Sequence, residues 1–140
     1  MNSADLAQEL LAAYEAGAPV AECPSTRDPA FDMTAAYAVE AEIARRRLAS
    51  GHARAGLKVG YANKAIWRAL KLETLVWAHL YDDTVLYTDQ NDATLSLSGL
   101  VSPKIEPEIV IRLKAPVEGG QDAATVLAST EWVALGFEII

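Results

Sequence analysis

The sequence predicts an α+β protein in which two amino-terminal helices lead into a β-rich segment. Before residue 52, apolar side chains recur at the three- and four-residue spacing of an amphipathic helix. After residue 52, short glycine-flanked runs rich in β-branched residues dominate, as is typical of strands. We therefore expect a helical region over residues 1–52 and a β-rich region over residues 53–140.

Each expected helix has identifiable signals at its ends. The first is expected over residues 3–16, on an apolar stripe that includes Leu6. Residues 18–31 contain three prolines and are expected to form a loop. The second helix begins near Asp32 or Thr34, both good N-caps, and ends at Gly51.

The β-rich region divides into short elements at glycines, prolines and acidic pairs. Strands are expected over residues 53–61, 76–83, 84–89, 100–114 and 132–140. Short helices are expected over residues 63–72 and 121–129.

The composition limits the class of protein. A net charge of −7 and a pI near 4.7 argue against nucleic-acid binding, which needs a basic surface. The amino terminus lacks a signal-peptide pattern, and no apolar run approaches the length that spans a bilayer. We therefore predict a cytoplasmic protein that binds neither nucleic acid nor membrane. The chain ends within the apolar run 137–140, which suggests a fragment or a truncated reading frame.

An acidic pair in the stretch 100–114 points to a metal site. Alternate residues of a strand share a face, so Glu106 and Glu108 project the same way, about 7 Å apart at their roots. Like charges so placed repel each other, and a divalent cation such as Mg²⁺ or Mn²⁺ removes that cost. Pro107 between them belongs on an edge strand or at a bulge, a common place to direct side chains into a site.

Glu138 is a third candidate ligand, because it lies within an otherwise apolar run. Such a glutamate either faces solvent or is buried with a partner, since an unpaired buried charge is too costly. On the residues alone, a solvated strand face explains Glu106 and Glu108 as well as a metal site does. A plain binding module with solvated glutamates is therefore an open alternative.

A lysine between two glycines is the second point of interest. Strand alternation places Lys58 on the same face as Gly56 and Gly60, which leave space for a ligand or another backbone. A lysine in such a place can pair with a substrate carboxylate or act as an acid or base. The alternative is a lysine at a strand edge, with the glycines serving turns.

Taken together, four ordered segments resemble a known family. They are Gly-Leu-Lys-Val-Gly (56–60), His-Leu-Tyr-Asp-Asp (79–83), Lys-Ile-Glu-Pro-Glu-Ile (104–109) and Ala-Leu-Gly-Phe-Glu-Ile-Ile (134–140). Over nearly the whole chain, this order resembles the 2-keto-4-pentenoate hydratase and oxalocrotonate decarboxylase branch of the fumarylacetoacetate hydrolase superfamily. The resemblance implies the first part of a fumarylacetoacetate-hydrolase-like fold.

The resemblance also implies roles for individual residues. Glu106, Glu108 and Glu138 match the metal triad of the family, which implies that they bind Mg²⁺ or Mn²⁺. Lys58 is implied as a substrate contact or proton-transfer group.

Two further positions follow from the same resemblance. Asp82 matches an acidic position that orients water or substrate, although the adjacent Asp83 could take that role. Leu80 is implied to line the substrate pocket.

The chain departs from the family in two respects. Hydrolase members use a His-Glu pair in an early mobile segment, whereas the only histidines here are His52 and His79. Nothing marks His52 as catalytic, and His79, which alternates with Trp77 and Tyr81, is interpreted as structural. Members are also considerably longer, and the sheet that completes their substrate pocket is missing here.

The resemblance therefore implies a hydratase that adds water to a 2-hydroxy-dienoate or 2-oxo-enoate to give a 4-hydroxy-2-oxo acid in aromatic catabolism. The alternatives are a 2-oxo acid decarboxylase of the same family and a truncated, non-catalytic assembly partner. The expected partners are a small 2-oxo acid substrate, a second copy of the chain, since an open sheet edge favours self-association, and a related decarboxylase or hydratase.

Overall fold

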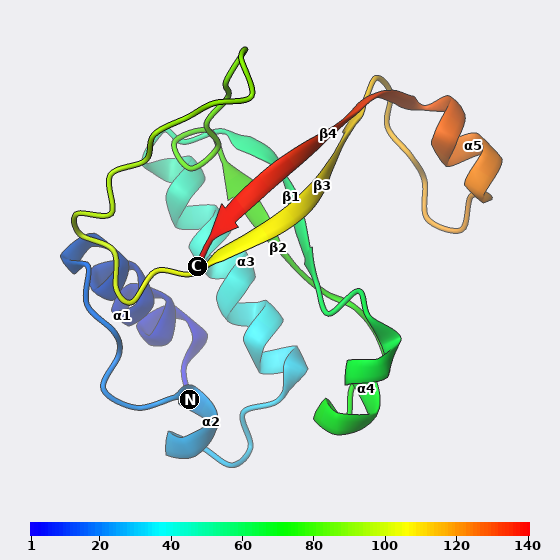
Figure 1. Cartoon of the computed structure of the whole chain (residues 1–140). Helices are drawn as coiled ribbons and strands as arrows, with labels where there is room; N and C mark the ends of the chain where they lie inside the picture. The colour runs from blue at the N-terminus through cyan, green and yellow to red at the C-terminus, as the bar shows by residue number, and fades with distance from the viewer. The chain divides into compact units, whose positions relative to one another are not determined.

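The computed structural model describes all residues from 1 to 140. Helices and strands mix along the chain, and the strands form two separate two-stranded sheets. In chain order the elements are α1 (Ser3–Ala16), α2 (Pro24–Arg27), α3 (Met33–Ala49), β1 (Arg54–Gly60), α4 (Lys64–Leu70), β2 (Val76–Tyr81), β3 (Ile105–Leu113), α5 (Ala123–Ala128) and β4 (Thr130–Ile139) (Figure 1). The expected mixture of helix and sheet is thus confirmed.

Contacts divide the chain into two compact units, Met1–Ser96 and Leu97–Ile140. The first unit contains α1 to α4 and the β1–β2 sheet, and the second contains β3, α5 and β4. The expected regions 1–52 and 53–140 are divided where helices give way to strands. The division of the chain into domains at that point stays a prediction. None of the helices combines the length and the apolar character needed to cross a membrane.

The core of the first unit lies where α1 meets α3. Leu6, Ala7 and Val39 are buried there, and Leu10 and Ile43 pack against them. These apolar residues recur at helical spacing, so each helix buries one face against the other. Both helices are capped at their amino ends. The side chain of Asn2 accepts a hydrogen bond from a backbone N–H in the first turn of α1, and that of Asp32 does the same for α3.

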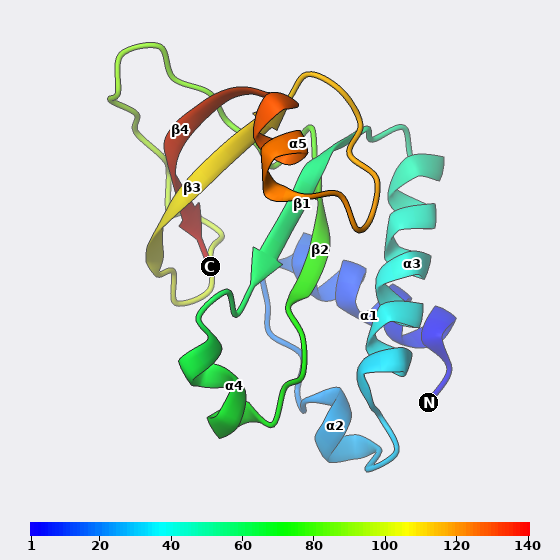
Figure 2. The same ribbon diagram turned by 90° about the vertical axis from the view of Figure 1, so that its right-hand side faces the viewer.

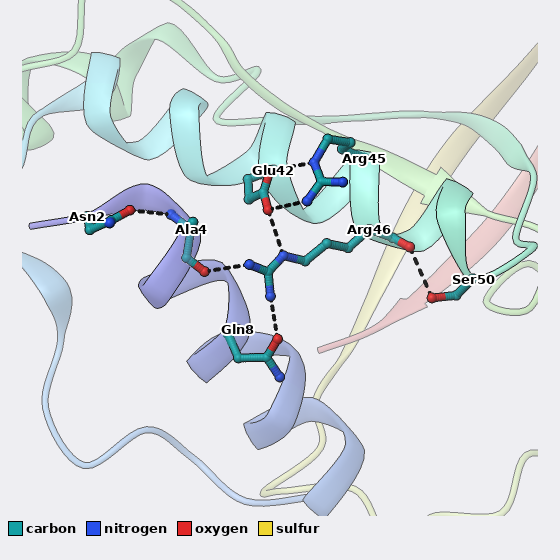
Figure 3. Close-up of polar contacts among 7 residues, drawn as sticks. All are labelled: Asn2, Ala4, Gln8, Glu42, Arg45, Arg46 and Ser50. Carbon is teal, nitrogen blue, oxygen red and sulfur yellow. Dashed lines mark hydrogen bonds and ion pairs between the residues drawn. The ribbon is translucent and has the colours of Figure 1, made fainter.

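A polar network also joins α1 to α3 (Figure 3). The guanidinium of Arg46 donates to Glu42 at 2.7 Å, to the carbonyl of Ala4 at 2.9 Å and to the side chain of Gln8. Arg45 donates to the same glutamate at 2.7 Å. Hydrogen bonds from Arg45, the larger effect, and from Arg46 lower the pKa of Glu42 to about 2.

One face of β2 packs against α3 (Figure 2). Trp77, His79 and Tyr81 lie on this face, because alternate residues of a strand point the same way. The backbone N–H of Trp77 donates to the hydroxyl of Tyr37 at 3.2 Å, and the ring centroids of these two residues are 5.2 Å apart. The guanidinium carbon of Arg47 lies 4.6 Å from the centre of the Tyr81 ring.

The second unit is an antiparallel ladder of β3 and β4, with α5 in the connection between them (Figure 1). The pairing continues beyond the strands, because Lys104 and Ile140 exchange backbone hydrogen bonds of 2.7 and 3.0 Å. One face of the ladder is apolar and open, with Phe137 71% and Leu135 87% exposed.

The structure corrects three expected elements. Residues 84–89 form no strand: the N–H and hydroxyl of Thr84 both bond to the carbonyl of Tyr81, which makes a turn. Residues 24–27, expected to be loop, form the short helix α2, whose first residue is a proline that already has a helical φ. The strand expected from residue 100 begins only at Ile105, where pairing with β4 begins.

Candidate metal centre

The register of the β3–β4 ladder brings three glutamates to one point. Glu106 lies directly opposite Glu138, and Glu108 lies opposite Gly136. Residues paired across a ladder and residues two apart along a strand share a face. One carboxylate oxygen from each of the three glutamates lies within 4.8 Å of the other two. The structure thus groups the three residues for which the sequence predicted a shared role, and the metal they would bind stays a prediction.

A glycine in β4 permits close packing beside this cluster. Gly136 faces Glu108 and stands two residues before Glu138, so a side chain here would point to the carboxylate face. A Cβ atom at this position would lie 2.9 Å from Cγ2 of Val110, closer than real Cβ contacts allow. The absence of a side chain at Gly136 therefore lets Val110 lie against β4 next to the glutamates.

The chemistry of the cluster suits a divalent cation. Glu106 is exposed, while Glu108 and Glu138 are half-buried. Like charges directly opposite each other destabilise a strand pair, and a bound cation offsets that repulsion. Carboxylate oxygens are the ligands that Mg²⁺, Mn²⁺ and Ca²⁺ prefer. The three carboxylates therefore fit the divalent cation that was predicted from the sequence.

Lys58 and Leu80 lie in the first unit, on the β1–β2 sheet. Lys58 pairs with Ala78, and Gly56 pairs with Leu80, so Lys58 and Leu80 share a face. This face is opposite the one that carries His79, which packs on α3. A Cβ at Gly56 would meet nothing within 4 Å, so there is open space beside Lys58 on that side.

The glycine on the other side of Lys58 leaves no such space. A Cβ at Gly60 would lie 2.9 Å from Cγ2 of Val76. Of the two glycines expected to make room beside the lysine, only Gly56 does so.

Asp82 closes the end of the β1–β2 ladder. Its Oδ1 accepts a hydrogen bond of 3.0 Å from the N–H of Ala53, and its own N–H donates to the carbonyl of Ala53 at 3.0 Å. The hydrogen bond from Ala53 is the main reason why the pKa of Asp82 lies below its usual value. Asp82 is therefore held as a carboxylate, which suits it to accept a hydrogen bond rather than to supply a proton.

A second acidic cluster, which the sequence did not suggest, lies beside Asp82. Nδ1 of His52 is 3.7 Å from Oδ1 of Asp82 and 3.6 Å from Oδ1 of Asp83. Arg47 forms an ion pair with Asp83. This cluster already contains a cation, so it suits a structural role better than metal binding. Antiparallel pairing of residues 53–61 with 76–83 was the signal that could have revealed it.

His79, interpreted from the sequence as structural, connects β2 to α3. Its Nδ1 is 2.5 Å from Oε1 of Glu40, and its backbone N–H donates to the same oxygen at 3.2 Å. Its ring centroid lies 5.4 Å from that of Trp77 and 6.4 Å from that of Tyr81. The imidazole is thus held among its neighbours in the packing, in agreement with the structural interpretation.

Comparison with known proteins identifies hydratases and decarboxylases as relatives. The chain is 35% identical over 124 residues to 4-oxalocrotonate decarboxylase from Pseudomonas sp. (strain CF600), covering 86% of this chain and 46% of that protein. It is 34% identical over 113 residues to 2-hydroxyhexa-2,4-dienoate hydratase from Comamonas testosteroni, covering 80% and 42%. It is 28% identical over 137 residues to 2-keto-4-pentenoate hydratase from Paraburkholderia xenovorans (strain LB400), covering 97% and 49%. No protein-family model matches the chain.

Two solved structures of a decarboxylase also match the chain. 4-Oxalocrotonate decarboxylase from Pseudomonas putida G7, complexed with magnesium and adipate, matches with a TM-score of 0.88 and 29% identity, over 99% of this chain and 51% of that one. The same enzyme complexed with calcium and acetate matches with the same TM-score, over 52% of its chain. The chain thus spans about half the length of the curated relatives and solved structures that it matches.

Proposed function

We propose that this chain, a homologue of the 2-keto-4-pentenoate hydratases and 4-oxalocrotonate decarboxylases, is the metal-binding part of a hydratase acting on unsaturated 2-oxo acids. The observation that carries the proposal is the convergence of Glu106, Glu108 and Glu138 within 4.8 Å. The substrate would be a 2-hydroxy-dienoate or its 2-oxo-enoate form, and the product a 4-hydroxy-2-oxo acid. We further propose a fumarylacetoacetate-hydrolase-like fold for the whole protein and a cytoplasmic location.

The three glutamates would hold Mg²⁺ or Mn²⁺. Homologous decarboxylase structures complexed with magnesium and with calcium support a divalent cation here. When bound, such a cation supplies a Lewis acid that stabilises negative charge on the 2-oxygen of the substrate. Opposed glutamates on a paired ladder are well suited to this task, because the ladder holds them in place before the cation arrives.

Residues of the β1–β2 sheet would serve the substrate and its protons. Lys58 would pair with the substrate carboxylate or transfer a proton. Asp82, held as a carboxylate by Ala53, would accept a hydrogen bond from the water that adds to the double bond. Leu80, on the same face as Lys58, would contribute an apolar wall.

A decarboxylase of the same family is the second candidate. It is favoured by the relatives named 4-oxalocrotonate decarboxylase, which include both of the solved structures compared. Release of CO₂ from a 2-oxo dicarboxylic acid, without hydration of a dienoate, would decide for this alternative. A third candidate is a non-catalytic assembly partner. Whichever function holds, we propose that the chain associates with itself and with a related hydratase or decarboxylase.

Thermal unfolding with and without Mg²⁺ or Mn²⁺ tests the metal centre directly. A ligand that binds only the folded state stabilises it by about 2.7 kcal/mol at a hundredfold excess over its Kd. We expect the melting temperature to rise with the cation, and this rise to be lost in Glu106→Gln/Glu108→Gln.

Glu118→Gln is the matched control, since Glu118 is an exposed carboxylate of the same unit outside the cluster. It should keep the full response to the cation. An equal response in all three proteins, or no response in the parent, would contradict the proposed centre. For the reaction itself, hydration of a 2-hydroxy-dienoate should stop on treatment with EDTA and return with Mg²⁺.

A further inference from the structure

A pocket of about 260 Å³ lies in the first unit, among α1, α3 and β2. Its apolar wall includes Leu10, Leu11 and Ile43, and its polar wall includes Arg47 and Tyr81. Tyr81 lies on the face of β2 that packs against α3, opposite the face that carries Lys58 and Leu80. The pocket is therefore distinct from the residues assigned to the proposed reaction. Its size suits a small ligand, since pockets for drug-sized molecules begin near roughly 300 Å³.

Two hydrogen-bond donors in this pocket lack partners. Tyr81 is only 7% exposed, and its hydroxyl is buried without a hydrogen-bond partner. The Nε of Arg47 is likewise buried without a partner, although another nitrogen of this guanidinium pairs with Asp83. Buried polar groups in native proteins nearly always have partners, because leaving them unsatisfied is costly. Both residues line the same pocket, so one ligand can satisfy both donors once their side chains turn toward it.

The protonation of these groups defines what they can bind. Burial, and then the negative charge of Glu40, raise the pKa of Tyr81, so its hydroxyl keeps its proton at neutral pH. The guanidinium of Arg47 has donors and no acceptor. A molecule that satisfies both must therefore bring acceptor oxygens at one end. The leucine and isoleucine side chains opposite favour an aliphatic body at the other end.

We propose that this pocket binds a short-chain aliphatic carboxylate. Its carboxylate oxygens accept hydrogen bonds from Nε of Arg47 and from the hydroxyl of Tyr81, and its chain lies against Leu10, Leu11 and Ile43. A carboxylate fits better than a neutral carbonyl, because its two oxygens can serve two donors, one of them charged. The site needs no metal and uses none of the three glutamates.

Calorimetric titration of the full chain with sodium hexanoate, in a buffer containing EDTA, tests the proposal. EDTA removes divalent cations, so binding observed here is independent of the metal centre, and either site can fail without the other. Tyr81→Phe keeps the ring and removes only the hydroxyl. We expect its affinity for hexanoate to fall about tenfold or more. Its melting temperature without ligand should stay equal or rise, because an unsatisfied buried group is gone.

Tyr37→Phe is the matched control. Tyr37 lies outside the pocket lining, and its hydroxyl accepts a hydrogen bond from Trp77. This variant should keep its affinity for hexanoate while losing some stability. Arg47→Lys, which keeps the positive charge near Asp83 but lacks the Nε donor, is a second test and should also weaken binding. Absence of hexanoate binding to the parent at millimolar concentration, or unchanged affinity in a folded Tyr81→Phe or Arg47→Lys variant, would overturn the proposal.

Discussion

Replacing Gly136 by alanine should disturb the β3–β4 ladder at the carboxylate cluster. The added Cβ would lie 2.9 Å from Cγ2 of Val110, whereas ordinary van der Waals contact begins at 3.4 Å. Val110 is β-branched and stiff at χ1, so relief requires movement of its backbone or of β4. Because Gly136 faces Glu108 and stands two residues before Glu138, that movement occurs where these two carboxylates converge.

The size of the effect follows from two opposing contributions. Overpacking costs about 1–3 kcal/mol in a closed core, and Val110 is 42% exposed, which favours the lower half of that range. Removing a glycine from a strand interior returns about 0.5–1 kcal/mol through lower entropy of the unfolded chain. Gly56→Ala has only the second contribution, because a Cβ there meets nothing within 4 Å. We therefore expect Gly136→Ala to be less stable than Gly56→Ala by about 1–2 kcal/mol.

Urea unfolding of the single variants and of Gly136→Ala/Val110→Ala measures this difference. Truncating Val110 removes the clashing methyl group, so the two changes should be non-additive by about 1 kcal/mol. Titration with Mg²⁺ should show weaker binding in Gly136→Ala, partly restored in the double variant. Equal stability of the two alanine variants, together with additive effects in the double variant, would refute the packing argument.

Two further predictions concern the network between α1 and α3. Arg46→Met should lower the free energy of unfolding by about 1–2 kcal/mol, since it removes hydrogen bonds to Ala4 and Gln8 across the helix pair. Arg45→Met, which removes only a pair within α3, should cost less than about 0.5 kcal/mol in the same chemical denaturation measurement. The pKa of Glu42 is lowered to about 2 from 4.5, so its stabilising contribution is complete above pH 4.5 and disappears as the pH falls toward 2. Thermal melts across this range should show a shallower loss of stability in Glu42→Gln, and an unchanged slope would contradict the assignment.

The grouping of the glutamates was predictable because it depends on strand periodicity. Alternation alone puts Glu106 and Glu108 on one face, and Glu138 lies in a second strand of the same character. What alternation cannot give is the register, which decides whether Glu138 meets Glu106 or lies several residues away. In the structure these two residues are directly paired.

Other features depend on contacts between distant segments and had no local signal. Residues 84–89 are rich in β-branched and aromatic residues, as strands are, but no partner strand pairs with them, and Leu86 is 75% exposed. The unsatisfied donors of Arg47 and Tyr81 become apparent only when α3 packs on β2. Position 136 looks like an ordinary strand glycine until the Val110 side chain is seen packed against it.

The placement of the glutamates within the ladder has a consequence for how this sequence can diverge. The connection over residues 114–129 leaves one end of the ladder, while Glu106 and Glu138 pair near the other end. Insertions or deletions in that connection leave the ladder register unchanged. Related sequences can therefore lengthen, shorten or replace α5 while the carboxylates keep their positions. A single-residue insertion between Thr130 and Glu138 has the opposite effect, because it turns the glutamate to the apolar face. Natural variation in length should therefore accumulate in the connection and be purged from the strands.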